Sequence, residues 1–224
     1  FFVKDNGPGL DEDQFENVFF RFFESTKDSS NVYNGTMGLG CKSAYSYNTK
    51  TFTVESVKSG KKYIYSCFIG NTGVPEYTLL YSGDTTEESG LKVQIPVDIK
   101  DIDEFVENAK SVYQWFVVPP KFIGKQLELP ELFVERNENY GLLKNIRGCY
   151  AIMSNVAYPI EAHFKLNAHN EIIRRSAIAL FFDNGDISFT PSRESVEYTD
   201  RTINAINNKF NLIIKEIKES IEAK

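Results

Sequence analysis

Two stretches near the start of the chain decide its fold: Asp5-Asn6-Gly7-Pro8-Gly9 and Gly35-Thr36-Met37-Gly38-Leu39-Gly40-Cys41-Lys42-Ser43. Residues 1–4 are predicted to end a buried strand that leads directly into the first stretch. Its glycines tolerate positive φ and close backbone approach, and Pro8 fixes its own φ. This turn can therefore hold the Asp5 carboxylate still, as an acceptor for an exocyclic amine such as that of adenine.

The second stretch is predicted to be a loop that opens onto a helix. Its glycines, Gly35, Gly38 and Gly40, are spaced so that successive backbone N–H groups can turn toward an anion. The helix that is predicted to begin at Lys42-Ser43 would favour phosphate at its N-terminus. The two stretches together therefore predict a nucleotide pocket.

Simpler readings of each stretch remain. The first stretch alone is equally well explained as an ordinary surface turn. The second is not a P-loop, because Cys41 separates Gly40 from Lys42. It is not a dinucleotide fingerprint either, because Ser43 stands in the place of the third glycine. The pair in this order is more specific than either half.

The pattern Asp5-x-Gly7-x-Gly9 with Gly35-x-x-Gly38-x-Gly40 resembles the first and second glycine boxes of the GHKL ATPases. This family includes gyrase, the ninety-kilodalton heat-shock chaperone, histidine kinases and the mismatch-repair ATPase. Nearly the whole chain further resembles the rIIA-type proteins of tailed phages. The segments that carry this second resemblance are residues 2–9, 38–47, 90–97, 150–152 with 158–160, and 191–194.

The resemblance implies an α+β fold of the α/β-sandwich type. Residues 1–100 would form a Bergerat-type (GHKL) nucleotide-binding domain without its N-terminal helix. Residues 101–120 would form a connecting helix with a proline break, and residues 121–224 a smaller transducer-like α/β domain with a long C-terminal helix.

The resemblance also assigns the site. Asp5 would bond the adenine amino group, Gly9 would let the base lie against the backbone, and residues 25–40 would form a lid over the triphosphate. A plain solvated loop is the alternative for the lid. The residues expected to bind the nucleotide are Asp5, Asn6, Gly7, Gly9, Gly35, Gly38, Leu39, Gly40, Lys42 and Ser43.

The chain departs from the family pattern in two places. The family's catalytic Glu and magnesium-binding Asn lie on a helix before the first glycine turn, whereas this chain begins at Phe1. We therefore interpret it as a fragment, expect the magnesium ligand upstream of Phe1, and assign no residue here as general base or metal ligand. Whether ATP is hydrolysed stays open. The strand box that usually reads Gly-Thr is Gly90-Leu91 here.

Residues 188–194 resemble the catalytic loop in the second domain of the heat-shock chaperones. By that resemblance Arg193 would sense the γ-phosphate, a task that suits a planar, permanently charged fork. The alternative is structural: Ser192 caps a helix and Arg193 pairs with Glu194 or Glu197 on the surface.

For function, the resemblance implies an ATP-binding protein of the rIIA type in which ATP with magnesium orders the lid and closes the domains. It would act in the cytoplasm of the infected bacterial host, protecting against prophage-encoded exclusion and early lysis. Its partners would be ATP and an unidentified phage or host protein; a homodimer and peripheral membrane association are left open. The alternatives are an inactive scaffold of the same fold and a DNA-topology or repair ATPase subunit.

Composition sets further bounds. The 224 residues suffice for one large or two modest cores. A formal charge of -6 argues against a broad nucleic-acid surface, although Lys58, Lys61 and Lys62 could form a local patch. The intervening Ser59-Gly60 instead favours a solvated hairpin end.

Three widely spaced cysteines, Cys41, Cys67 and Cys149, favour a reducing compartment and free thiols. The histidines, His163 and His169, are interpreted as surface residues without a metal. No apolar run is long enough to span a bilayer.

Hydrophobic periodicity predicts the remaining elements. Helices are expected at residues 11–23, beneath the pocket, at 101–117 and, with a one-sided apolar stripe, at 200–223. Strands are expected at residues 51–57, 63–69, 76–81 and 91–97, forming a mostly antiparallel sheet with helices on one face. Further strands are expected at 150–160 and 178–182, and a turn at Gly185-Asp186.

Overall fold

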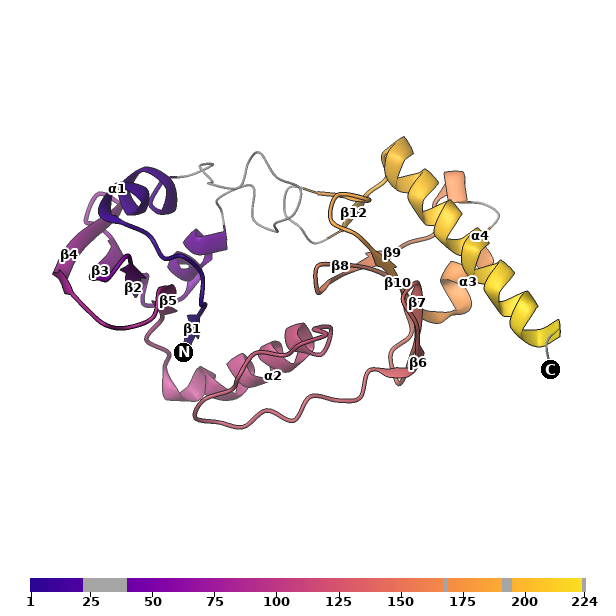
Figure 1. Ribbon diagram of the computed structural model, residues 1–224, viewed down its shortest axis with the longest axis horizontal. Coiled ribbons are helices and arrows are strands. Elements are labelled where there is room, and N and C mark those ends of the chain that lie inside the picture. Colours follow the sequence, from indigo (N-terminus) through magenta and orange to yellow (C-terminus); the bar gives the residue numbers. More distant parts are fainter. Residues whose placement is uncertain (22–39, 167–168, 191–194, 223–224) are drawn as a thin grey trace. The chain divides into compact units, whose positions relative to one another are not determined.

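A computed structural model of the chain describes residues 1–21, 40–166, 169–190 and 195–222 (Figure 1). The chain divides into two compact units, Phe1–Ile102 and Asp103–Lys224. Each unit has its own sheet and its own core. That the first is a nucleotide-binding domain and the second a transducer-like domain stays a prediction.

The first unit is built on a five-stranded antiparallel sheet. Its order is β1 (Phe2–Lys4), β5 (Gly90–Gln94), β2 (Thr51–Lys58), β3 (Lys61–Ile69) and β4 (Pro75–Asp84). Alternating residues of β2 and β3 point to one buried face, as the period of two requires. The four predicted strands are confirmed. Ser59 and Gly60 have positive φ and turn β2 into β3, so the three lysines lie at a hairpin end, as predicted.

Two predictions for the first unit are corrected. Residues 2–4 do form a strand, but all three are exposed, because β1 lies at the edge of the sheet and, among the described strands, pairs only with β5. The predicted helix 11–23 is a short α1 (Glu12–Gln14) followed by a π-helix, η1 (Phe15–Phe19). The wider turn is closed by a bond from the N–H of Phe20 to the carbonyl of Phe15.

Aromatic packing joins this helical segment to the sheet. Phe15 is fully buried, and its ring stacks on Tyr65 of β3 at 3.6 Å and on Phe19 at 5.2 Å between centroids. Tyr77 of β4 closes the cluster edge-on at 5.2 Å from Phe15. The helix therefore covers one face of the sheet directly after the first glycine turn.

The connection between the units begins with a single turn, η3 (Ile99–Asp101), and continues as α2 (Ile102–Tyr113). The predicted helix 101–117 is confirmed, although it ends four residues early. In the described part of the chain no helix is both long enough and apolar enough to cross a membrane.

The second unit has a mixed five-stranded sheet. Its order is β6 (Phe133–Arg136), β7 (Tyr140–Leu143), β10 (Ala177–Phe182), β8 (Gly148–Met153) and β9 (Val156–Ile160). β10 runs parallel to β8, and the other pairs are antiparallel. The strand predicted at 178–182 is confirmed. The one predicted at 150–160 is instead the hairpin β8–β9, because Ser154 and Asn155 both take positive φ and reverse the chain.

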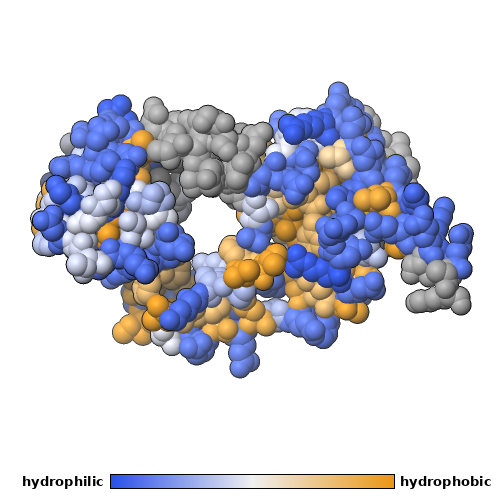
Figure 2. All heavy atoms as spheres, viewed as in Figure 1, coloured by the Kyte–Doolittle hydropathy of each residue, from blue (hydrophilic) through white to orange (hydrophobic). Residues whose placement is uncertain are grey.

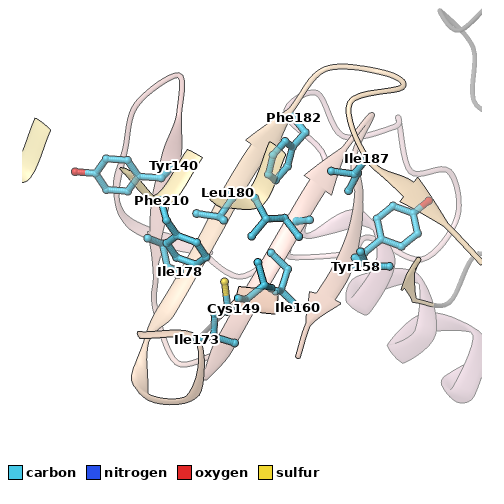
Figure 3. Packing of buried hydrophobic residues seen from close by; sticks show 14 of the residues in the cluster. Tyr140, Cys149, Tyr158, Ile160, Ile173, Ile178, Leu180, Phe182, Ile187 and Phe210 are labelled. Carbon is cyan, nitrogen blue, oxygen red and sulfur yellow. The ribbon is translucent and has the colours of Figure 1, made fainter. Parts of the chain in front are cut away.

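Helices α3 (Asn170–Arg175) and α4 (Asp200–Glu222) pack their apolar sides against one face of this sheet (Figure 3). Ile178, Leu180 and Phe182 of β10 point to this side, and Phe210 of α4 meets them there. The predicted stripe on the last helix is confirmed for Ile203, Ile206, Phe210 and Ile213, whereas Ile217 is exposed. The visible surface of α4 is mostly hydrophilic (Figure 2).

His169 was predicted at the surface, and this prediction is wrong. The side chain is 6% exposed and stacks on Phe210 at 4.9 Å. Its Nδ1 atom is buried and has no hydrogen-bond partner among the described residues. Burial lowers the pKa of His169 below the usual 6.5, because the charged imidazolium would lose its hydration.

The second unit should therefore lose stability in mild acid. The pKa of His169 is lower in the folded than in the unfolded state. The contribution of the neutral imidazole to stability is therefore fully present above about pH 6.5 and is lost as the pH drops below it. Urea unfolding at pH 7.5 and 5.5, followed by the fluorescence of the single tryptophan, Trp115, measures this effect in the second unit. His169→Leu should remove most of the difference, and an equal difference in both proteins would contradict the assignment.

Candidate functional site

The Asp5 carboxylate is held by the main chain. Asp5 follows β1, and its N–H donates to the carbonyl of Leu91 at 2.9 Å. Its Oδ1 accepts from the N–H of Gly7 at 2.8 Å and of Leu91 at 3.1 Å. Among the described residues Oδ2 accepts no hydrogen bond, and the side chain is exposed. The carboxylate is thus a fixed acceptor with one oxygen presented outward.

Glycines allow the close approach that this arrangement needs. A Cβ on Gly7 would lie 3.0 Å from Oδ1 of Asp5, and one on Gly90 would lie 2.3 Å from the Asp5 carbonyl oxygen. Leu91 contributes through its N–H, while its side chain packs against the core. Sequence reasoning noted Leu91 only as a departure from Gly-Thr, because a main-chain contact leaves no trace in the residue type.

Gly9 packs against the sheet. Its φ is +69°, the residue is buried, and a Cβ would lie 2.0 Å from the carbonyl oxygen of Val57 at the end of β2. This packing role was not predicted. That a base lies against Gly9 stays a prediction.

Ser56 and Lys58 of β2 hold the two residues after Gly9, Leu10 and Asp11, against the sheet. The buried Ser56 hydroxyl accepts from the N–H of Leu10 and donates to the carbonyl of Leu10, both at 2.7 Å. Asp11 caps α1 by accepting from the N–H of Gln14 at 2.9 Å, and Lys58 lies 2.8 Å from its second oxygen. The bond from Lys58, together with that from Gln14, lowers the pKa of Asp11. Sequence reasoning missed Ser56 altogether.

Of the second stretch, Gly40, Lys42 and Ser43 are described, and they lie in a 3-10 helix, η2 (Gly40–Ser46). The Ser43 hydroxyl donates to the carbonyl of Gly40 at 2.7 Å. The Lys42 ammonium is buried, donates to the carbonyl of Phe19 and lies 5.8 Å from the Phe19 ring centre. In this arrangement Lys42 bonds η1, so a phosphate contact would require its movement. Gly35, Gly38, Leu39 and residues 25–39 of the lid predicted at 25–40 lie outside the described residues.

Arg193 also lies outside the described residues. Strands β11 (Ser188–Phe189) and β12 (Val196–Glu197) pair on either side of residues 191–194. The structural alternative for Ser192 and Arg193 lies outside the described residues as well, and the helix α4 begins at Asp200. Thr199 caps that helix, accepting from the N–H of Thr202 at 3.2 Å.

No described group of three or more His, Cys, Asp or Glu residues could hold a metal ion. Magnesium commonly keeps several waters and is held through substrate phosphates with only one or two carboxylates.

Comparisons with known proteins point to one fold. Residues 1–77 match the family described as "Histidine kinase-, DNA gyrase B-, and HSP90-like ATPase". The crystal structure of the ATPase region of Saccharomyces cerevisiae topoisomerase II is similar, with a TM-score of 0.50 and 16% identity over 92% of this chain and 73% of that chain. For the same region bound to ICRF-187 (dexrazoxane), the TM-score is 0.46 and the identity 14%, over 96% and 76%. No curated protein matches the chain.

The chain thus has a mixed α/β, GHKL ATPase-like fold, and the predicted fold class is confirmed. At 16% identity the likeness to the topoisomerase II region is one of fold alone. The family match contains the first glycine stretch and the described part of the second.

Proposed function

We propose that the first unit binds ATP, with the Asp5 carboxylate accepting from the adenine amino group. The observation that carries this proposal is the geometry of Asp5. Two main-chain N–H groups fix one carboxylate oxygen, and the other faces outward at the end of an edge strand. An acceptor fixed in advance loses little freedom when a ligand arrives.

The second glycine stretch would meet the phosphates, through backbone N–H groups before η2 and through Lys42 once it leaves the Phe19 carbonyl. Magnesium would arrive with the phosphates. We further propose that ATP orders residues 25–40 as a lid and that Arg193 contacts the terminal phosphate. For ATP to favour this closed state it must bind it more tightly than the open state, and these contacts would supply the difference.

The biological role that we propose is that of an rIIA-type phage protein, which uses this closure to act on a host or phage partner. Its support is the sequence resemblance in five segments, of which four overlap described strands, turns or η2. An inactive scaffold of the same fold is the competing proposal.

Replacing Asp5 with alanine should weaken ATP binding by about 1.5–3 kcal/mol, the usual worth of a hydrogen bond to a charged group. Asp5→Asn is the sharper variant, because it keeps an oxygen for Gly7 and Leu91 while placing an amide donor toward the ligand. Calorimetry measures the effect on ATP affinity. The control is Asp84→Ala, which removes an exposed carboxylate on β4. Unchanged affinity in both Asp5 variants would remove the assignment.

Replacing Arg193 with alanine should weaken binding of ATP far more than binding of ADP, because only ATP carries the terminal phosphate. Parallel titrations of both nucleotides into the wild type and the variant measure the ratio. Equal losses of affinity for ATP and ADP would show that Arg193 does not contact the terminal phosphate and would favour a structural role.

The proposed function itself is tested by titrating magnesium-ATP and ADP into the protein together with any residues that naturally precede Phe1. The 224-residue chain serves as a second sample. Binding by either supports ATP recognition, and binding only by the longer protein places the missing contacts upstream. Absence of binding by both would favour the scaffold.

A further inference from the structure

Tyr47 connects the second glycine stretch to the segment that leads out of the first unit. It directly follows η2, the helix that begins at Gly40. Its hydroxyl donates to Oδ2 of Asp101 at 2.6 Å and accepts from the N–H of Asp98 at 2.9 Å. Asp98 and Asp101 enclose the turn η3, and α2 begins at the next residue, Ile102.

Side-chain bonds and one ring contact hold the helix η2 together and against the sheet. Inside it, the hydroxyls of Ser43 and Ser46 bond carbonyls three residues earlier, at 2.7 and 2.5 Å. Tyr45 packs edge-on against Phe52 of β2 at 4.8 Å. The first residues of η2 belong to the proposed phosphate-binding stretch, and its last residue, Ser46, directly precedes Tyr47.

The bonds of Tyr47 reach the part of the chain where the two units divide. The boundary falls after Ile102, one residue beyond Asp101, and α2 continues into the second unit. The bond to Asp101 raises the pKa of Tyr47, so the hydroxyl keeps its proton at neutral pH and remains a donor. Asp101 in turn bonds through its N–H to the carbonyl of Asp98 at 3.0 Å, which closes η3.

We propose that Tyr47 is a positioning residue that couples nucleotide binding at η2 to the order of the first turn of α2. This coupling rests on the proposed ATP binding. A nucleotide that fixes η2 also fixes the phenol against Asp98 and Asp101, so the start of α2 opens less often. Typical couplings between sites amount to about 5–150-fold in an equilibrium constant.

Hydrogen exchange of residues 98–113, with and without magnesium and a non-hydrolysable ATP analogue, tests the coupling. In the wild type the analogue should slow exchange there by about fivefold or more. Tyr47→Phe, which removes the hydroxyl and keeps the ring, should still bind the analogue by calorimetry but lose this slowing. Tyr81→Phe, which removes an exposed hydroxyl on β4, should behave as the wild type.

Asp101→Ala provides an independent second variant, because it removes the acceptor and leaves Tyr47 in place. It should lose the slowing as well, and the double variant should lose no more than either single one. Undiminished slowing in both single variants would overturn the coupling, as would a wild type that binds the analogue without any change at residues 98–113. A wild type that fails to bind the analogue overturns the proposed function first, and the calorimetry tells these outcomes apart.

Discussion

Replacing Phe15 with alanine is expected to destabilise the first unit by about 3–5 kcal/mol, the usual range for a large buried aromatic side chain. Phe15 is fully buried, and its ring stacks closely on Tyr65 and Phe19. The variant would leave a cavity between η1 and the sheet, and η1 has no other fully buried side chain among its described residues to hold it there.

Native-state hydrogen exchange of β2 and β3 measures this loss in the first unit. Trp115 lies in the second unit, so its unfolding transition in the same variant is an internal control and should not move. Leu80→Ala, at a 60% exposed position on β4, should change stability by no more than about 0.5 kcal/mol. A loss below about 1 kcal/mol for Phe15→Ala would show that η1 is not anchored through this ring.

Replacing Gly9 with alanine is expected to cost about 2–5 kcal/mol. Left-handed backbone costs an L-residue about 1–2 kcal/mol, and overpacking typically adds about 1–3 kcal/mol. The added methyl would meet the carbonyl oxygen of Val57 at 2.0 Å, and a backbone atom of a central strand cannot turn aside as a side chain can.

Gly73 offers a matched control, because its φ of +80° is similar while no atom lies within 4 Å of its Cβ position. Gly73→Ala should show only the conformational cost. Urea unfolding of the first unit, monitored by hydrogen exchange, measures the loss of stability in each of the two variants. If Gly9→Ala unfolded like Gly73→Ala yet bound ATP poorly, then Gly9 would act mainly on the ligand and not on the packing.

The sequence predicted those parts of the fold whose residues follow a regular period. β2 and β3, of eight and nine residues, largely alternate between buried and half-buried positions, and the stripe on α4 repeats over several turns. β6 and β7 were missed because each has four residues and their pairing shifts register between Phe133 and Glu135. The hairpin β8–β9 was read as one strand because its turn, Ser154-Asn155, contains no glycine.

The same limit explains what was predicted of the site. Asp5 and its glycines are adjacent in the chain, so their turn could be recognised from the local sequence. Leu91 and Ser56 act on that turn from strands far along the chain, and no local pattern indicates such a contact. His169 was placed at the surface because its polar neighbours hide its packing on Phe210, which lies 41 positions later (210 − 169).

The bonds that hold the first glycine turn also determine when it can form. The carboxylate of Asp5 accepts from the N–H of Leu91, which lies 86 residues later. The backbone N–H of Leu10 donates to the hydroxyl of Ser56, which lies 46 residues later. The hairpin β2–β3 and the pair β3–β4, in contrast, join neighbours in the chain and close short loops first. During synthesis, residues 5–11 emerge from the ribosome before β5, yet they take their final shape only after β5 has joined the sheet. The first glycine turn is thus among the last parts of the first unit to fold.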